Sequence, residues 1–252
     1  MPKVSIIMPT YNRSWIIERA VNSVLQQTMS DFELIIIDDG STDDTVKKVK
    51  NIEDKRIVMH SLSENKGQVV ARNEGLKIAQ GEIIAYLDSD NVWYKNYLEV
   101  MLAELTPYYI LVYSAQNVFL CSGSKENLHV IGRQVRDYLY NPDGLTRGNS
   151  IDINCTIHRK SILDEVGMFD ENLKTLEDWD IFARIAVKHP FQIKHVSQVL
   201  GEYYFFLRDT ASTVENGILS DDWLREHFNL HQPTGDDKVV IDKIKKLIGN
   251  NQ

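Results

Sequence analysis

The sequence predicts an α/β fold in which helices cover both faces of a Rossmann-like, mostly parallel sheet, within one continuous domain. Two observations predict it. Short, almost uninterrupted apolar segments alternate with segments of helical periodicity through residues 1–90. Strands of a parallel sheet that is covered on both faces have this apolar character, and the alternation is typical of strand–helix–strand units.

The first half supplies four expected strands and three expected helices. The strands are 4–8, 32–37, 56–62 and 82–90, and the helices lie within 12–28, 45–50 and 65–80. Pro9 should end the first strand, since proline cannot donate to a sheet ladder. Asn12 or Ser14 should cap the first helix, whose apolar residues recur at helical spacing from Ile16 to Leu25. Gly81 should stop the third helix.

The second half is less regular. Its expected strands are 108–120, 151–160 and 196–208, and its expected helices are 161–167 and 176–189. We expect residues 1–215 to form the main domain, followed by a helical extension over 216–252. Ligands bind at the carboxyl ends of parallel strands. We expect the main domain to have two functional halves, in which residues 1–106 bind one substrate and residues 107–215 bind the other.

Composition excludes several classes of function. The chain has 252 residues, is 43% hydrophobic and carries a formal net charge of −8, which would repel the phosphates of DNA or RNA. Its two cysteines, Cys121 and Cys155, lack metal-type spacing. The apolar run at the N-terminus is too short for a signal peptide, and no run reaches the roughly 20 residues that span a bilayer. We therefore expect a cytoplasmic protein without a nucleic-acid partner.

Polar side chains follow three of the expected strands at the point where each strand ends. They are Thr10 to Arg13 after the first, Asp38 to Asp43 after the second and Asp88 to Asp90 after the fourth. Each acidic cluster alone is also good turn chemistry. One or two carboxylates that hold a divalent cation, completed by substrate phosphates, are the alternative. Two acidic turns at one edge of the same sheet favour a site for a phosphorylated, polyhydroxylated ligand.

The order and spacing of six segments resemble the family-2 glycosyltransferases of GT-A fold. The resemblance covers residues 3 to about 212. Several motifs in one order make it specific, whereas the Asp-x-Asp motif alone would be weak. The six segments are VSIIMPTYNR, ELIIIDDGSTDDT, NKGQVVARNEGL, GEIIAYLDSDN, EVGMFDENL and LEDWDIFARIA.

The resemblance implies inverting transfer of a sugar from a nucleotide-sugar donor, most often a UDP-sugar, to a glycan or glycolipid acceptor in cell-surface assembly. By this analogy Thr10, Tyr11 and Arg13 wall the base pocket, and Asp39 accepts a hydrogen bond from the base. Each position also has a structural alternative; Tyr11, for example, could simply pack against its neighbours.

The remaining implied donor residues follow the third helix motif and the fourth strand. Arg72 would lie near the base or the phosphates, unless it is a surface helix residue. Asp88 would approach the ribose and the metal, and Asp90 would bind Mn²⁺ or Mg²⁺ directly, with Ser89 between them in the donor site. A carboxylate suits a ribose hydroxyl and a guanidinium suits a phosphate.

The resemblance assigns the general base to Asp178. Inverting transfer needs a base that removes the proton of the acceptor hydroxyl. Acidic residues at the start of a helix also stabilise its dipole, which is the structural alternative. Glu177 would orient the acceptor or the base. Trp179 would either stack on the acceptor sugar or pack in the core.

The sequence departs from the family pattern near its end. Many relatives carry a histidine there as a further metal ligand, but if Ser212 aligns with the family's serine, Leu207 stands at that position. Arg208 is then the nearest cation for the phosphates. This departure keeps a second hypothesis open, a non-catalytic module that binds sugar nucleotides or glycans.

The C-terminal segment 236–252 has an apolar stripe with lysines opposite. It could pack on its own domain or on a partner subunit in a homo-oligomer, or lie on an anionic membrane as a peripheral contact. The early Gly-x-Gly-x-x-Gly turn of dinucleotide oxidoreductases is absent, as are the P-loop lysine and the Gln-x-x-Arg-Trp motif of processive synthases.

Overall fold

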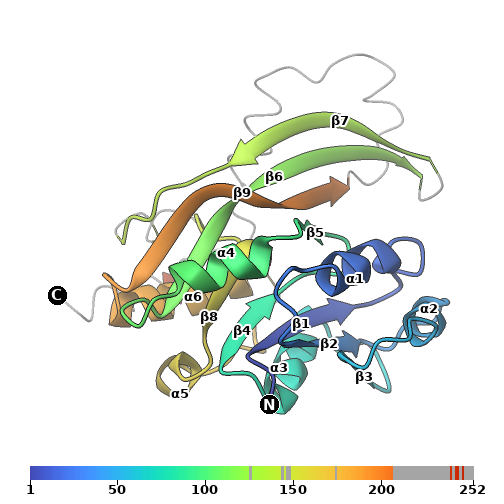
Figure 1. The fold of residues 1–252 in the computed structure, drawn as a ribbon, viewed down its shortest axis with the longest axis horizontal. Coiled ribbons are helices and arrows are strands. Elements are labelled where there is room, and N and C mark those ends of the chain that lie inside the picture. The colour runs from blue at the N-terminus through green and yellow to red at the C-terminus, as the bar shows by residue number, and fades with distance from the viewer. Residues whose placement is uncertain are drawn as a thin grey trace.

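The structure is a computed structural model. It describes residues 1–124, 127–142, 145, 149–173 and 175–206, together with 239, 242, 243 and 246. The prediction of a single α/β sheet covered on both faces is confirmed (Figure 1). The expected strand at 196–208 and the tail fall partly or largely outside the described residues.

One sheet of nine strands organises the described part of the chain, in the order β3-β2-β1-β4-β8-β6-β9-β5, with β7 paired to β6. The strands of the first half, β1 to β4, are parallel neighbours. The antiparallel strand β8 joins β4 to β6 and so connects the two halves. The strands are β1 (Val4–Thr10), β2 (Phe32–Asp38), β3 (Ile57–Ser61), β4 (Ile83–Tyr86), β5 (Val92–Trp93), β6 (Leu111–Ser124), β7 (Asn127–Arg136), β8 (Thr156–Arg159) and β9 (Ile193–Phe206).

Within the part of the chain that the structure describes, six helices flank the sheet in two layers, each over its own hydrophobic core. α1, α2 and α4 cover one face, and α3, α5 and α6 cover the other (Figure 1). The helices are α1 (Ile17–Leu25), α2 (Thr45–Lys50), α3 (Gln68–Ile78), α4 (Tyr97–Glu104), α5 (Ile162–Val166) and α6 (Glu177–Lys188). Within the described residues, none is long and apolar enough to cross a bilayer.

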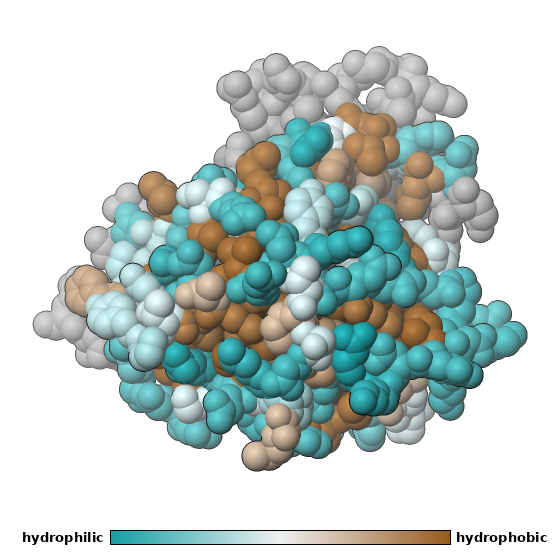
Figure 2. All heavy atoms as spheres, viewed as in Figure 1, coloured by the Kyte–Doolittle hydropathy of each residue, from teal (hydrophilic) through white to brown (hydrophobic). Residues whose placement is uncertain are grey.

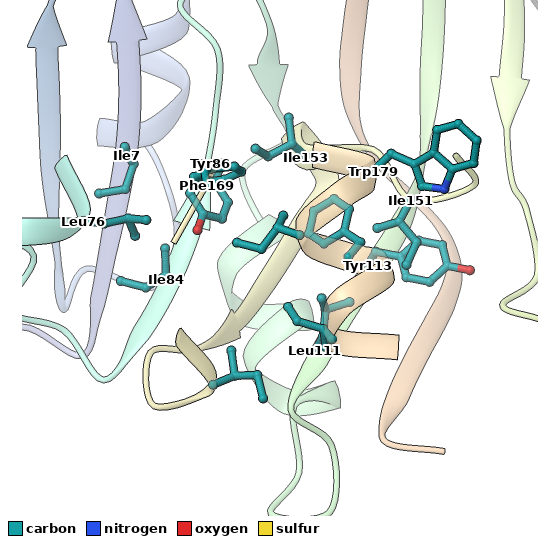
Figure 3. Packing of buried hydrophobic residues seen from close by; sticks show 14 of the residues in the cluster. Ile7, Leu76, Ile84, Tyr86, Leu111, Tyr113, Ile151, Ile153, Phe169 and Trp179 are labelled. Atoms are coloured by element: carbon teal, nitrogen blue, oxygen red, sulfur yellow. The ribbon is translucent and has the colours of Figure 1, made fainter. Parts of the chain in front are cut away.

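The two cores follow from the alternation of side chains along each strand. Ile6 and Met8 of β1 join the core under α1, while Ile7 joins the core under α3. Figure 3 shows this second core, in which Ile7 and Leu76 pack beside Tyr86 and Phe169. β1 and β2 are therefore buried on both faces, which explains why most of their residues are apolar. The buried polar residues Ser5 and Glu33 bond each other, with the Ser5 hydroxyl donating to the Glu33 carboxylate at 2.6 Å.

Two expectations about the first strand and helix were wrong. β1 continues through Pro9 to Thr10, because its pairing with β4 ends at Ile7, so that edge needs no further donor. Neither Asn12 nor Ser14 caps α1, which begins at Ile17 without a side-chain cap. Asn12, at a positive φ of 51°, instead accepts the Thr42 N–H at 2.8 Å and joins the two polar turns.

The chain folds more tightly after β4 than expected. β4 ends at Tyr86 rather than continuing to residue 90, and Asn91 N–H donates to the Asp88 carbonyl at 3.0 Å. Asp88 and Asp90 therefore lie on a turn and do not share one face of an extended strand. In the second half, β8 is shorter than the expected strand at 151–160 because a 3₁₀ turn, Ile153–Cys155, precedes it.

Gly81 is required where α3 returns to the sheet. A Cβ added there would lie 2.6 Å from the Ser5 backbone nitrogen and 2.8 Å from the Val4 carbonyl carbon, in the central strand. We expect Gly81→Ala to lower the free energy of unfolding by about 1–3 kcal/mol, since β1 cannot yield. Urea unfolding measures this, with the exposed neighbour Gln80→Ala as control. Equal stability of both variants would show that β1 can move.

The second half leaves apolar side chains at the surface. Val130 and Val135 of β7 are each more than half exposed. In Figure 2 hydrophilic side chains predominate on the face shown, and some hydrophobic ones gather over the strands in the upper part of the view.

Candidate active site

A cavity of about 440 Å³ opens at the carboxyl edge of the parallel strands. Its walls come from the segments after β1, β2 and β4, from the loop before α3, and from β9. The lining residues are Pro9, Thr10, Tyr11, Arg13, Asp39, Asn65, Gly67, Gln68, Asp88, Ser89, Asp90, Asn91, Tyr203 and Tyr204. This is the location at which doubly wound sheets bind ligands.

The structure brings together every residue that the sequence nominated for the donor and metal, except Arg72. Thr10, Tyr11 and Arg13 form one side, and Asp39 lies beside them because its N–H donates to the Thr10 carbonyl at 2.8 Å. Thr10 is buried, whereas Tyr11 is 40% exposed and open to a planar ligand. Their roles toward a ligand stay predictions.

Asp39 anchors the loop that closes the cavity from the α3 side. Its carboxylate accepts the backbone N–H of Lys66 at 2.7 Å and of Gly67 at 2.8 Å. The neighbouring Gly40 has a φ of +73°, and a Cβ there would lie 2.7 Å from the Glu64 carbonyl carbon. The loop therefore packs directly on the turn after β2. Each carboxylate oxygen keeps a lone pair for a further donor.

We expect Asp39→Asn to release this loop. The asparagine amide would place an N–H group, instead of an acceptor oxygen, opposite one of the two backbone N–H groups that the Asp39 carboxylate binds. Hydrogen exchange at the Lys66 and Gly67 amides should become at least about tenfold faster, the loss of one hydrogen bond to a charged acceptor. The measurement is exchange mass spectrometry at residue resolution. Unchanged exchange at both amides would mean that the loop is held by other contacts. Asp31→Asn, a change at an exposed site, serves as the control.

Asp88 is held on both sides by protein donors. Its Oδ1 accepts from Arg72 at 2.8 Å and its Oδ2 accepts from the Asn154 amide at 3.2 Å. Asn154 also accepts the Asp88 N–H at 2.7 Å, while Asp152 accepts from the Asn154 backbone N–H at 2.9 Å. The 3₁₀ turn before β8 thus fixes the orientation of this carboxylate.

Asp90 is less constrained and faces the cavity. Within the described residues, its carboxylate accepts a 3.3 Å hydrogen bond from Arg13 Nε and forms an ion pair with it, and Arg19 donates to its backbone carbonyl at 2.7 Å. Burial and the nearby Asp88 raise the pKa of Asp90, although Arg13 opposes this. The second negative charge of Asp88 favours binding of a cation in the cavity beside Asp90.

The donor set fits a hard divalent cation that shares its ligands with a diphosphate. Among the described residues, no group of three His, Cys, Asp or Glu side chains could hold a metal by itself. Asp90 offers free carboxylate oxygens, and oxygen ligands are those that Mg²⁺ and Mn²⁺ prefer. Leu207, Arg208 and Ser212, on which the histidine question depends, lie outside the described residues.

Arg72 is buried, so the alternative of a surface helix position is wrong, and its nearness to the base or the phosphates stays a prediction. Its side chain is 2% exposed behind the cavity, and it does not line the cavity. One guanidinium nitrogen bonds Asp88 and the other bonds Glu177. Glu177 is also buried and accepts from Gln68 at 2.7 Å. Because Glu177 contacts Arg72 and Gln68 in this arrangement, we expect it to act on an acceptor through these neighbours and not by direct contact.

Asp178 lies at the start of α6, beside this buried ion pair. The preceding Leu176 has a positive φ of 55°, an uncommon conformation for a bulky residue that turns the chain sharply into the helix. Asp178 accepts from the Asn149 amide at 3.0 Å. Burial, with the charges of Glu177 and Asp152, raises the pKa of Asp178 to about 7 against the opposing charge of Arg72. Such a carboxylate can accept a proton near neutral pH.

Trp179 packs in the core. It is 5% exposed, and its indole N–H donates to the Leu145 carbonyl at 2.8 Å. Figure 3 shows it beside Ile151 and Tyr113. This placement supports the packing alternative over stacking on a sugar.

Sequence reasoning missed Tyr203, Tyr204 and Asn154. Tyr204 N–H donates to Asn91, and the Tyr204 ring lies 3.8 Å from the Arg19 guanidinium carbon. β9 brings both tyrosines to the cavity by pairing in parallel with β6. The aromatic run in GEYYFF was the available signal.

The parallel half-sheet, the mixed second half and the acidic cavity at the strand ends define a GT-A architecture. Solved structures agree. A Staphylococcus aureus TarS fragment in complex with UDP-GlcNAc has a TM-score of 0.69 over 98% of this chain and 67% of its own, at 21% identity. A Pyrobaculum calidifontis mannosyltransferase in complex with GDP-Man and Mn²⁺ scores 0.63 over 99% and 73%, at 16% identity.

Sequence comparison gives the family. The model "Glycosyl transferase family 2" matches residues 5–166, and the chain belongs to this family. WcaA of Escherichia coli K12, whose name refers to colanic acid biosynthesis, is 31% identical over 79% of this chain and 72% of its own. A Rickettsia conorii glycosyltransferase is 34% identical over 74% of this chain, which spans about 30% of that relative's length.

One relative is named for its substrates. WfgD of Escherichia coli, a UDP-Glc:alpha-D-GlcNAc-diphosphoundecaprenol beta-1,3-glucosyltransferase, is 45% identical over 100 residues, 40% of each chain.

Proposed function

We propose that this chain transfers a sugar from a nucleoside-diphosphate sugar to an acceptor hydroxyl with inversion at the anomeric carbon. The observation that carries the proposal is the presence of two carboxylates in different settings. Asp90 lines the cavity beside the partly exposed Arg13, and Asp178, with a pKa of about 7, lies beside the buried Arg72–Glu177 pair that reaches back to Asp88.

The donor would enter the cavity with its base between Tyr11 and Asp39 and its diphosphate toward Asp90. Arg13 is 38% exposed and close enough to Asp90 to move toward a phosphate. Asp88, fixed by Asn154 and Arg72, would accept from a ribose hydroxyl. A divalent ion bound by Asp90 would neutralise charge on the leaving diphosphate.

The chemical step would be one displacement. The acceptor oxygen would attack the anomeric carbon from the face opposite the diphosphate, and the bond between that carbon and the diphosphate oxygen would break. Asp178 would take the hydroxyl proton as the new bond forms. Inversion follows because there is a single attack.

The comparisons support a donor of the UDP class and a sugar acceptor in cell-surface assembly. UDP-GlcNAc occupies the TarS complex, GDP-Man occupies the archaeal enzyme, and WfgD is named for UDP-Glc and a lipid-diphosphate-linked sugar. We propose a UDP-sugar as donor and a lipid-linked or free glycan as acceptor, which would bring the enzyme to the inner face of a membrane.

A donor panel tests this proposal. UDP-, GDP- and dTDP-sugars are each incubated with Mn²⁺ and a set of sugar acceptors, and chromatography measures release of the nucleoside diphosphate. We expect one nucleotide class to be turned over, and proton NMR of the product to show the anomeric configuration opposite to that of the donor. Tight binding without turnover of any donor would favour the non-catalytic binding module.

A further inference from the structure

The buried guanidinium of Arg72 connects the two sides of the site. Arg72 lies on α3 and is 2% exposed. It donates to Asp88 Oδ1 at 2.8 Å and, through its other terminal nitrogen, to Glu177. Asp88 belongs to the turn after β4 on the donor side. Glu177 is the first residue of α6 and the chain neighbour of Asp178.

The Arg72 guanidinium is buried between two carboxylates, those of Asp88 and Glu177. Gln68 donates to Glu177 at 2.7 Å and Asn154 donates to Asp88 at 3.2 Å, so neutral amides complete the hydrogen bonding at both ends. Burying charges costs free energy unless geometry and partners are good. The planar guanidinium group of arginine can donate to both carboxylates at once, whereas the ammonium group of lysine is a single point charge.

We infer that Arg72 is a positioning residue that holds the donor-side carboxylate Asp88 and the base-side carboxylate Glu177 in register. The inference rests on the proposed function for its consequence in catalysis. It assigns Arg72 no contact with the base, the phosphates or the acceptor.

The charges around Asp178 indicate in which direction Arg72 affects the pKa of that carboxyl. Glu177 on its own helix and Asp152 before the 3₁₀ turn both raise the pKa of Asp178, while Arg72 on α3 lowers it. Asn149 contributes a neutral donor. Removing the Arg72 charge should therefore raise this pKa, and removing the Glu177 charge should lower it.

The test is a carbon-13 carboxyl NMR titration of the full chain, with the Asp178 signal assigned by its loss in Asp178→Asn. Arg72→Gln should move the Asp178 pKa upward by about one unit, and Glu177→Gln should move it downward by a similar amount. Arg184→Gln is the matched control. It removes a guanidinium that pairs with buried Asp180 on the same helix, without contact to Glu177 or Asp88. No substrate is needed, so failure to find a donor does not affect this result.

A second readout tests the donor side. Arg72→Lys keeps the positive charge but cannot bridge both carboxylates, so the dissociation constant of the UDP–Mn²⁺ complex should rise about tenfold, while the Asp178 pKa shifts less than in Arg72→Gln. Circular dichroism tests whether each variant is folded. If Arg72→Gln does not fold, the Asp178 pKa in the near-isosteric variant Glu177→Gln tests the inference. Shifts of one sign in both variants, or shifts equal to that of Arg184→Gln, would overturn the inference.

Discussion

Asp178→Asn should reduce the turnover number by about 10²–10⁴-fold while leaving donor affinity within about twofold of the wild type. The amide keeps the size and the Asn149 contact of the side chain but cannot take a proton. Because Asp178 does not line the donor cavity, nucleotide binding should not depend on it. Steady-state rates, with nucleotide affinity measured separately, test both parts.

The wild-type rate should also depend on pH in a defined direction. Asp178 must be deprotonated to act as a base, so kcat/KM should rise as pH increases through about 7 and level off above it. Asp164→Asn, on an exposed helix position, is the control and should keep the full rate. An Asp178→Asn enzyme that retains most of its turnover would assign the base to another group.

Asp90→Asn should abolish metal-dependent nucleotide binding. Among the described residues, Arg13 is the one side chain that donates to Asp90, whereas both oxygens of Asp88 are engaged by protein donors, so Asp90 keeps more capacity for a cation. Loss of a direct carboxylate ligand should weaken the Mn²⁺–nucleotide complex on the order of 100-fold or more. Electron paramagnetic resonance of Mn²⁺, with and without UDP, measures the bound fraction directly.

Asp44→Asn provides the control for Asp90→Asn. Asp44 is an exposed acid at the N-terminal end of α2, outside the cavity, and its loss should leave Mn²⁺ binding unchanged. If Asp90→Asn bound Mn²⁺–UDP as the wild type does, the metal would have to be held by Asp88 or by other residues.

The sequence predicted the parallel half of the fold because these strands are buried on both faces. β2 is apolar from Phe32 to Ile37 except for Glu33, and a strand buried on both faces of a covered sheet requires this pattern. β7 was missed because its alternating polar residues belong to an exposed strand, and its pairing with β6 depends on tertiary context. For the acidic residues after β4, a strand end and a turn were both open from the sequence, and the structure shows the turn.

The candidate site was predictable where the chain itself places a residue at a strand end. Asp39, Asp88 and Asp90 follow β2 and β4, so their position at one sheet edge follows from parallel topology alone. The partners of Asp88 could not be predicted, because Asn154 and Arg72 reach it from the 3₁₀ turn before β8 and from α3 through packing. The motif alone could not show that Arg72 is buried, which excludes the surface alternative.

Titration calorimetry of UDP, GDP and dTDP against the wild-type chain, each with and without Mn²⁺, tests the central claim most directly. We predict that one nucleotide binds with micromolar affinity in the presence of Mn²⁺ and at least about tenfold more weakly without it, because without a cation the carboxylates of Asp88 and Asp90 would repel the diphosphate. If no nucleotide binds under either condition, or if the same affinity is found with and without metal, the proposed donor site is contradicted.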